Sequence, residues 1–220
     1  MNPSFDSVIA DLHLLRHPFY QAWMQGALSQ EILKDYARQY YFHVDRFPRY
    51  ISAIHSNCEN GTWRNELLKN LNDEEGSSGL SSHPELWLQF AEGLGLDRKD
   101  VLATTPRPAI QDVTSIFFGC ARASFHEGVG ALYAYESQVP EIAKSKIEGL
   151  KQYYGIQDQR TLCFFEVHQK ADIEHRKVLL NMLENFPETE KSCAKESARR
   201  AAKALWDFLS DVQEQELAHA

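Results

Sequence analysis

Three residues of one short stretch have the side chains and the spacing of a metal site. His168, Asp172 and His175 lie in HQKADIEHRK, and on an α-helix they fall within an arc of about 60°. They would therefore project from one face. Two neutral imidazoles and a carboxylate can bind iron, manganese or zinc, because imidazole suits borderline ions and carboxylate suits harder ones. Taken alone, the same spacing also fits a solvated polar face, so both interpretations stay open.

Three further candidates lie in other segments. Glu136 stands in GALYAYESQVP, whose small, aromatic and apolar residues predict burial, and an unpaired buried carboxylate is costly. Glu74 ends the segment NLNDEE, and His83 begins the next segment after a short loop. Each of these residues also fits a wet helix surface or helix end when it is considered alone.

The six residues together favour a site with two metal ions. They supply three carboxylates and three imidazoles from several segments. Two ions that share a bridging carboxylate need about this number of protein ligands and keep open positions for dioxygen or water. A single zinc ion would need only three or four of them. We therefore predict a dinuclear centre bound by Glu74, His83, Glu136, His168, Asp172 and His175.

Helices must position these residues, because apolar residues recur at intervals of three and four and alternating strand patterns are hard to find. Ser29 is a suitable N-cap, and Pro48 suits the first turn of a helix that follows a break at Asp45. The loop GSSGLSS cannot easily continue a helix. The expected helices cover residues 5–25, 30–44, 49–58, 62–75, 83–94, 113–121, 122–152, 158–185 and 188–212.

The fold expected from these elements is an all-α bundle with a central site built from facing side chains. The length of 220 residues fits one domain with one substantial core. The sequence contains no internal repeat, low-complexity linker or shift in composition. We therefore expect residues 1–220 to form a single domain.

Composition excludes several classes of partner. Hydrophobic residues make up 43% and charged residues 25%, which are values of a globular protein. The formal charge of -8 and the lack of a dense basic run argue against nucleic acid and anionic membranes. No stretch approaches the roughly 20 apolar residues of a membrane helix, and the first residues lack the pattern of a signal peptide. We expect a cytoplasmic protein.

Several segments carry a resemblance to a known family. The chain resembles the haem-oxygenase-like superfamily of roughly seven to eight helices, which includes the pyrroloquinoline-quinone synthases and the TenA proteins. It is most similar to the group of the chlamydial protein associating with death domains. The segments that carry this resemblance are HPFYQAWMQGALSQEILKDYARQYYFHVDRFPRYISAIHS, LLKNLNDEE, GVGALYAYESQVPEIAKSKIEGL and HQKADIEHRK.

The resemblance implies a dinuclear metal oxidase that holds iron, or iron and manganese, and that uses dioxygen and an external reductant. Members of the group are associated with para-aminobenzoate, a folate precursor, whose ring is cut from a tyrosine of the protein itself. The tyrosine implicated in this reaction matches Tyr20, and the lysine implicated as amino donor matches Lys146. Tyr36 and Tyr135 match family tyrosines near the metals. Sequence shows the phenols and not their distances from the metals.

Two other interpretations stay open. A metal-free oxidase similar to pyrroloquinoline-quinone synthase could bind a polar aromatic substrate in the same kind of bundle, but six metal-type ligands would then go unused. The second interpretation is an interaction protein, because the group that the chain resembles is named for its association with death domains. The sequence contains no recognisable docking motif. The expected partners are dioxygen and a small or self-derived aromatic substrate, and a homodimer is the default assembly.

Overall fold

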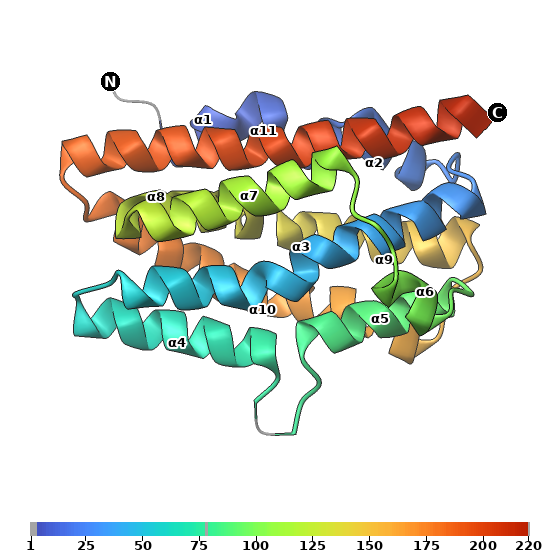
Figure 1. Ribbon diagram of the computed structural model, residues 1–220, viewed down its shortest axis with the longest axis horizontal. Helices are drawn as coiled ribbons and strands as arrows, with labels where there is room; N and C mark the ends of the chain where they lie inside the picture. Colours follow the sequence, from blue (N-terminus) through green and yellow to red (C-terminus); the bar gives the residue numbers. More distant parts are fainter. Residues whose placement is uncertain (1–3, 78, 220) are drawn as a thin grey trace.

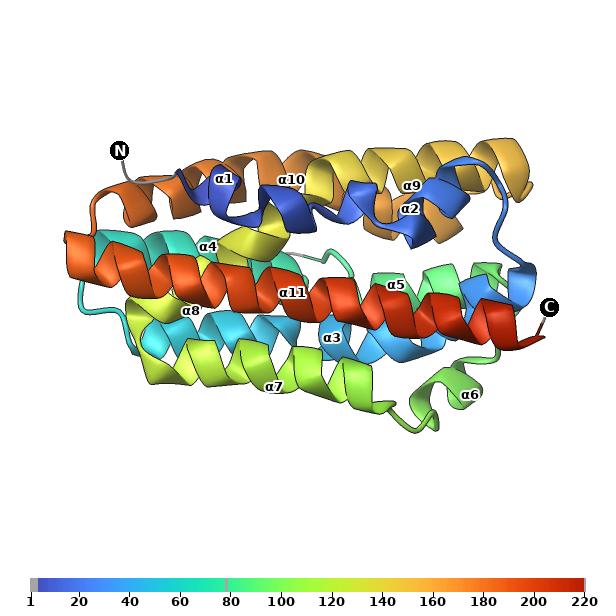
Figure 2. The same cartoon turned by 90° about the horizontal axis from the view of Figure 1, so that it is seen from above.

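Helices and the turns between them make up residues 4–77 and 79–219, which are the residues that the computed structural model describes. The expected all-α fold is confirmed. The long helices run along a common direction, so the molecule is an elongated bundle (Figures 1 and 2). Within the described residues, no helix is long and apolar enough to cross a membrane.

The helices differ greatly in length, and α3 and α11 extend over most of the bundle (Figure 1). The 3-10 turns η1 and η2 connect the first two helices. In chain order the elements are α1 (Phe5–Ile9), η1 (Ala10–Leu12), η2 (Leu14–Arg16), α2 (Pro18–Met24), α3 (Gln30–Ser56), α4 (Gly61–Glu75), α5 (His83–Gly93), α6 (Arg98–Leu102), α7 (Pro108–Ala123), α8 (Phe125–Glu136), α9 (Val139–Tyr153), α10 (Gln159–Glu184) and α11 (Glu188–His219).

Helices α4 and α5 follow one another along the same side of α3, with their connecting loop extending away from the bundle (Figure 1). The break has a local cause. Gly76 ends α4 in the left-handed conformation with φ of 76°, which favours glycine. Ser82 then caps the first turn of α5. As a result, Glu74 and His83 lie near the facing ends of two helices.

A second break separates α8 from α9, where the sequence predicted one helix over residues 122–152. That prediction was wrong because Pro140 has no N–H to donate to the carbonyl of Glu136, four residues before it. Helix α8 ends at Glu136 and packs mainly on α11, whereas α9 packs mainly on α10. Glu136 is therefore the last residue of a helix that ends inside the bundle.

Two expectations near other prolines were also wrong. The expected helix over 5–25 is divided, because Pro18 requires an extended residue before it, and His17 has φ of -68° and ψ of 138°. In contrast, α3 continues through the break expected at Asp45 and contains Pro48. The buried face of α3 runs on through Phe47 and Ile51, so its packing outweighs the hydrogen bond that Pro48 cannot make.

Aromatic side chains dominate the interior of the bundle. Trp23, Tyr36, Trp87 and Phe208 are all at most 1% exposed. Buried apolar residues from Phe5 to Val212 belong to one continuous cluster. This supports the prediction of a single domain over residues 1–220, which stays a prediction.

The contact between α8 and α11 gives a test of the packing. A Cβ atom at Gly130 would lie 2.2 Å from the carbonyl oxygen of Ala194, so Gly130→Ala should force the helices apart and lower the free energy of unfolding by about 1–3 kcal/mol. Gly119 is the matched control, because a Cβ there would meet nothing within 4 Å. Gly119→Ala should raise the free energy of unfolding by about 0.5–1 kcal/mol. Urea unfolding followed by circular dichroism measures both changes, and equal stability of the two variants would contradict this packing.

Candidate metal centre

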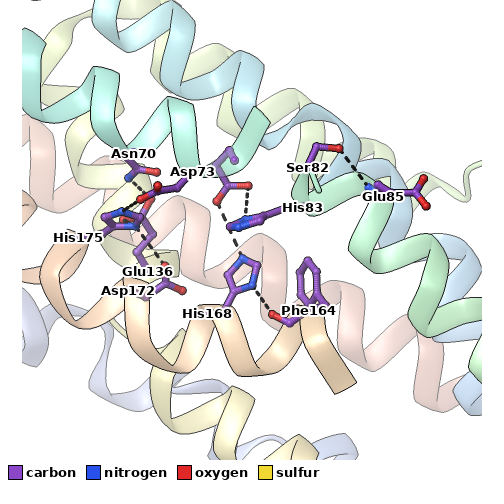
Figure 3. A network of polar contacts seen from close by, with 11 residues as sticks. Asn70, Asp73, Ser82, His83, Glu85, Glu136, Phe164, His168, Asp172 and His175 are labelled. Atoms are coloured by element: carbon purple, nitrogen blue, oxygen red, sulfur yellow. Dashed lines mark hydrogen bonds and ion pairs between the residues drawn. The ribbon is translucent and has the colours of Figure 1, made fainter. Parts of the chain in front are cut away.

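Glu74, His83 and His168 form a first triad of ligand-type side chains from α4, α5 and α10. His83 Nδ1 lies 2.8 Å from Glu74 Oε2, and His168 Nε2 lies 4.0 Å from Glu74 Oε1. One ligand atom from each residue lies within 4.8 Å of the others. None of the three is more than 4% exposed. This group could hold a metal ion (Figure 3).

The orientation of His168 suits that role. Its Nδ1 lies 2.6 Å from the carbonyl oxygen of Phe164. Because a carbonyl oxygen only accepts hydrogen bonds, Nδ1 carries the proton and Nε2 presents its lone pair toward Glu74. A histidine whose second nitrogen donates to a backbone carbonyl is the usual arrangement for a metal ligand.

Glu136, Asp172 and His175 form a second triad beside the first (Figure 3). His175 Nδ1 lies 3.3 Å from Asp172 Oδ1 and 3.9 Å from Glu136 Oε2. Both carboxylates are 1% exposed, and Glu136 Oε2 and Asp172 Oδ2 have no hydrogen-bond partner. Two unpartnered carboxylate oxygens in a dry interior are costly, and a bound cation would remove that cost. The residues of both triads therefore fit a pair of metal ions.

Two residues of α4 that the sequence analysis missed support the second triad. Asn70 Nδ2 donates to Glu136 Oε1 at 2.9 Å, and Asp73 Oδ2 lies 3.2 Å from His175 Nε2 (Figure 3). A carboxylate on the outer nitrogen fixes the ring of a ligating histidine. The signal in the sequence was the spacing, because Asn70, Asp73 and Glu74 share one face of α4.

Burial and nearby charges shift the pKa values of His175, Glu136 and Glu74. Burial lowers the pKa of His175, but its hydrogen bond with Asp172 and the charge of Glu136 outweigh burial and raise this pKa to about 10. Burial raises the pKa of the Glu136 carboxyl to about 8. Burial also acts to raise the pKa of Glu74, but the charge and hydrogen bond of His83 hold it below its ordinary value. Without metal, the second triad therefore holds protons at neutral pH.

A hydrogen-bonded chain of two tyrosines and a lysine lies deeper in the bundle. Lys146 Nζ donates to the Tyr36 hydroxyl at 2.6 Å, and the Tyr36 and Tyr20 hydroxyls are 3.5 Å apart. Burial holds the pKa of Lys146 well below its ordinary value and raises the pKa values of both tyrosines. Lys146 is 4% exposed. Burial thus favours the neutral amine and the neutral phenols in this chain of contacts.

A small cavity joins this chain to the first triad. Its volume is about 20 Å³, which is room for about one water molecule. Tyr20, Lys146 and Tyr135 line it, and so does His168 of the first triad. The reactive groups expected near the metals therefore share one enclosed space with a candidate ligand.

The structure brings all ten predicted site residues into one region of the bundle. The six candidate ligands form the two triads, and none of them lies apart. Tyr20, Tyr36 and Lys146 are in contact, and Tyr135 lies on the cavity wall next to Glu136. The roles of these residues as ligands and reacting groups stay predictions.

Known proteins resemble this chain over most of its length. The model of a family described as iron-containing redox enzyme matches residues 34–207. The 4-aminobenzoate synthase of Nitrosomonas europaea is 42% identical over 95% of this chain and 89% of its own length. The one from Chlamydia trachomatis is 37% identical over 93% and 88%.

More distant relatives share the fold. The pyrroloquinoline-quinone synthase of Ectopseudomonas mendocina is 25% identical over 74% of this chain and 67% of its own length. Among solved structures, a CADD-like protein of unknown function from Nostoc punctiforme superposes with a TM-score of 0.75 at 21% identity, covering 96% of this chain and 98% of that one. A TenA homologue from Pseudomonas syringae superposes with a TM-score of 0.79 at 14% identity, covering 96% and 91%.

Removing one carboxylate should remove one metal ion. Glu74→Gln takes the negative charge from the first triad, so the number of ions bound per chain should fall from about two to about one. Elemental analysis after anaerobic loading with Fe(II) or Mn(II) measures this number. Glu75→Gln, at the exposed neighbouring position, should bind as many ions as the unaltered protein. Equal metal content in both variants would contradict the assignment of Glu74.

Metal binding should also depend on pH. Below its pKa of about 10, His175 holds a proton that a metal ion must displace. The apparent affinity for Mn(II) should therefore rise about tenfold per pH unit from pH 6 to 8, and one proton or more should leave per ion. Isothermal titration calorimetry in buffers of different ionisation enthalpy counts these protons. An affinity that does not change with pH would show that the metal ion does not displace a proton from His175.

Proposed function

Since the chain belongs to the haem-oxygenase-like family of iron-containing redox enzymes, we propose that it is a 4-aminobenzoate synthase that uses dioxygen and two bound metal ions. Relatives with that name are 37–42% identical to it over most of both chains. The ring of the product would come from Tyr20 and the amino nitrogen from Lys146.

The two triads are the residues that would hold the metal. Mixed imidazole and carboxylate ligands suit iron or an iron and manganese pair. When bound, such a pair would supply one-electron oxidation with dioxygen, and an external reductant would complete the electron balance. The protein contributes six candidate ligands, of which five are buried and His175 is partly exposed, and Asn70 and Asp73 hold Glu136 and His175 in place.

The observation that carries the proposal is that the cavity lined by Tyr20 is too small for a second aromatic ring. Sites for small molecules usually measure about 300–1,000 Å³. The cavity measures about 20 Å³, and Tyr20 on its wall is 3% exposed. A free aromatic substrate has no room there. This favours a self-derived ring over the alternative of a metal-free oxidase that binds an external polar aromatic compound.

The atoms of Tyr20 match the carbon skeleton of the product. Its ring and Cβ become the ring and carboxyl carbon of an aminobenzoate when the Cα–Cβ bond breaks and Cβ is oxidised, with dioxygen as the oxidant. Lys146 Nζ then condenses with the oxygen-bearing carbon of the oxidised ring, and the phenol oxygen leaves as water. As the ring is reduced back to an aromatic amine, Cε of Lys146 is oxidised, and water cleaves the Cε–Nζ bond to leave an aldehyde on the lysine side chain. Lys146 suits the role of donor because burial favours its neutral form, whose lone pair is free to attack.

The side chains around Tyr20 also offer a partner for its phenolic proton. Oxidation of a phenol requires loss of the phenolic proton, and the Tyr36 hydroxyl is 3.5 Å from that of Tyr20. Tyr36 in turn accepts a hydrogen bond from Lys146 Nζ, so Tyr36 lies between the Tyr20 hydroxyl and the amine. Tyr135 lines the same cavity beside Glu136.

The cytoplasmic location and the homodimer expected from the sequence stay predictions.

Labelled protein tests the origin of the product. Protein made with ring-labelled tyrosine and nitrogen-labelled lysine should release doubly labelled 4-aminobenzoate, with no more than one molecule per chain. Tyr20→Phe and Lys146→Arg should each reduce product to background, because each removes an atom or a free amine that the reaction needs.

Two substitutions serve as controls for these variants. Tyr153→Phe and Lys144→Arg change exposed residues of the same types on α9 and should leave product formation unchanged. Mass spectrometry of the product and of the intact chain provides the readout. Unlabelled 4-aminobenzoate from fully labelled protein would overturn the self-derived origin of the ring.

A further inference from the structure

One part of the cavity wall is not α-helical. Leu14, in the 3-10 turn η2, lines the cavity, whereas the other lining residues belong to α2, α3, α8, α9 and α10. Local opening of a protein involves its short, irregular segments more readily than its long packed helices. Since Tyr20 is enclosed, Leu14 marks the part of the wall through which a cleaved ring could leave.

A surface pocket of about 370 Å³ lies on the outer side of this wall. His13 and Gln138 line the pocket, while the residues next to them in the chain, Leu14 and Val139, line the cavity. At both places, one residue lines the outer side of the wall and the next residue in the chain lines the cavity side. We call this space the exit pocket, and its lining residues also include Asp6, Ile9, Ala10, Arg16, Ser137, Glu141 and Arg176. Both carboxylates have a basic neighbour, because Asp6 Oδ2 lies 3.2 Å from Arg176 Nη2 and Glu141 Oε2 lies 3.7 Å from His13 Nε2.

One pair of hydrogen bonds holds the wall closed. The backbone N–H of Leu14 donates to Gln138 Oε1 at 2.7 Å, and Gln138 Nε2 donates to the carbonyl oxygen of Ala134 at 2.7 Å. Gln138 is 1% exposed. The Gln138 side chain therefore links the segment around Leu14 to the end of α8. Only noncovalent contacts join them at this point, so the segment around Leu14 can separate from α8.

The exit pocket has the chemistry to receive an aromatic carboxylate. Arg16 is exposed and donates to the carbonyl oxygen of Ala10, and within the described residues it has no carboxylate partner within ion-pair distance. Its guanidinium can therefore accept a carboxylate in a bidentate contact. The hydroxyl of Ser137, which is 4% exposed, also has no hydrogen-bond partner. Ile9 and Ala10 offer apolar surface for a ring.

We propose that the exit pocket binds the aromatic carboxylate product and receives it when the contact between Leu14 and Gln138 opens. The identity of the product rests on the proposed function. The pocket itself requires only an aromatic ring with a carboxylate, so the two proposals can fail separately.

Equilibrium binding tests the pocket without any turnover. Metal-free, full-length protein should bind added 4-aminobenzoate, and should bind aniline, which lacks the carboxylate, at least about tenfold more weakly. Arg16→Ala should weaken the binding of 4-aminobenzoate by a similar factor. Arg160→Ala is the control, because Arg160 is exposed, pairs with Glu92 and lies outside the pocket. Isothermal titration calorimetry gives the affinities, and equal affinities for both compounds or for both variants would overturn the proposed pocket.

Hydrogen exchange tests the opening of the wall. Gln138→Leu removes the acceptor of the Leu14 N–H and should speed exchange of that amide, and release of product, by about tenfold or more. Gln21→Leu is the matched control, because Gln21 Nε2 donates to the backbone carbonyl oxygen of Leu15 in the same segment, but Gln21 lies outside both spaces. Equal exchange in the two variants would overturn the role of Gln138. If no 4-aminobenzoate forms but added 4-aminobenzoate binds as described, the proposed function fails and the pocket stands.

Discussion

Burial of three carboxylates in the centre of one helical bundle is the constraint on which the rest of the structure depends. Glu74, Glu136 and Asp172 are each at most 3% exposed, and no water can solvate their charge. Three imidazoles face them, but oxygens of Glu136 and Asp172 still lack partners. A hydrophobic bundle gains nothing from such an arrangement unless cations complete it. A metal site therefore accounts for the burial of these carboxylates, which the apolar core alone does not.

The helix breaks serve this constraint. Glu74 and Glu136 both lie in the last turn of a helix, where the helix dipole disfavours negative charge and so adds to the need for a cation. The breaks after α4 and α8 place these carboxylates inside the bundle and not along a continuous helix. Helix α10 stays unbroken and presents three residues in fixed register. The six side chains therefore converge because α4 and α8 end at the site, whereas α10 passes the site without a break.

Sequence periodicity predicted the part of this site that one helix determines. His168, Asp172 and His175 share a face because of the helical repeat alone, and that holds in any fold that keeps α10. Asn70 and Asp73 could not be assigned a partner in advance, because their contacts join α4 to α8 and α10. The break at Glu136 was readable from Pro140, but the apolar run around it resembled one long helix. Cavity size depends on packing between helices, which no single segment encodes.

Enclosure of Tyr20 connects the site to the N-terminal segment. The rings of Phe19 and Trp23 in α2 both contact the Tyr20 ring. Trp23 Nε1 donates to the backbone carbonyl of Lys146, so α2 is anchored on α9 next to Tyr20. Loss of a buried aromatic side chain costs about 3–5 kcal/mol because it leaves a cavity. Excision of the Tyr20 ring would therefore loosen α2 and the adjoining η2, which carries Leu14. The same event that frees the product would weaken the wall that retains it.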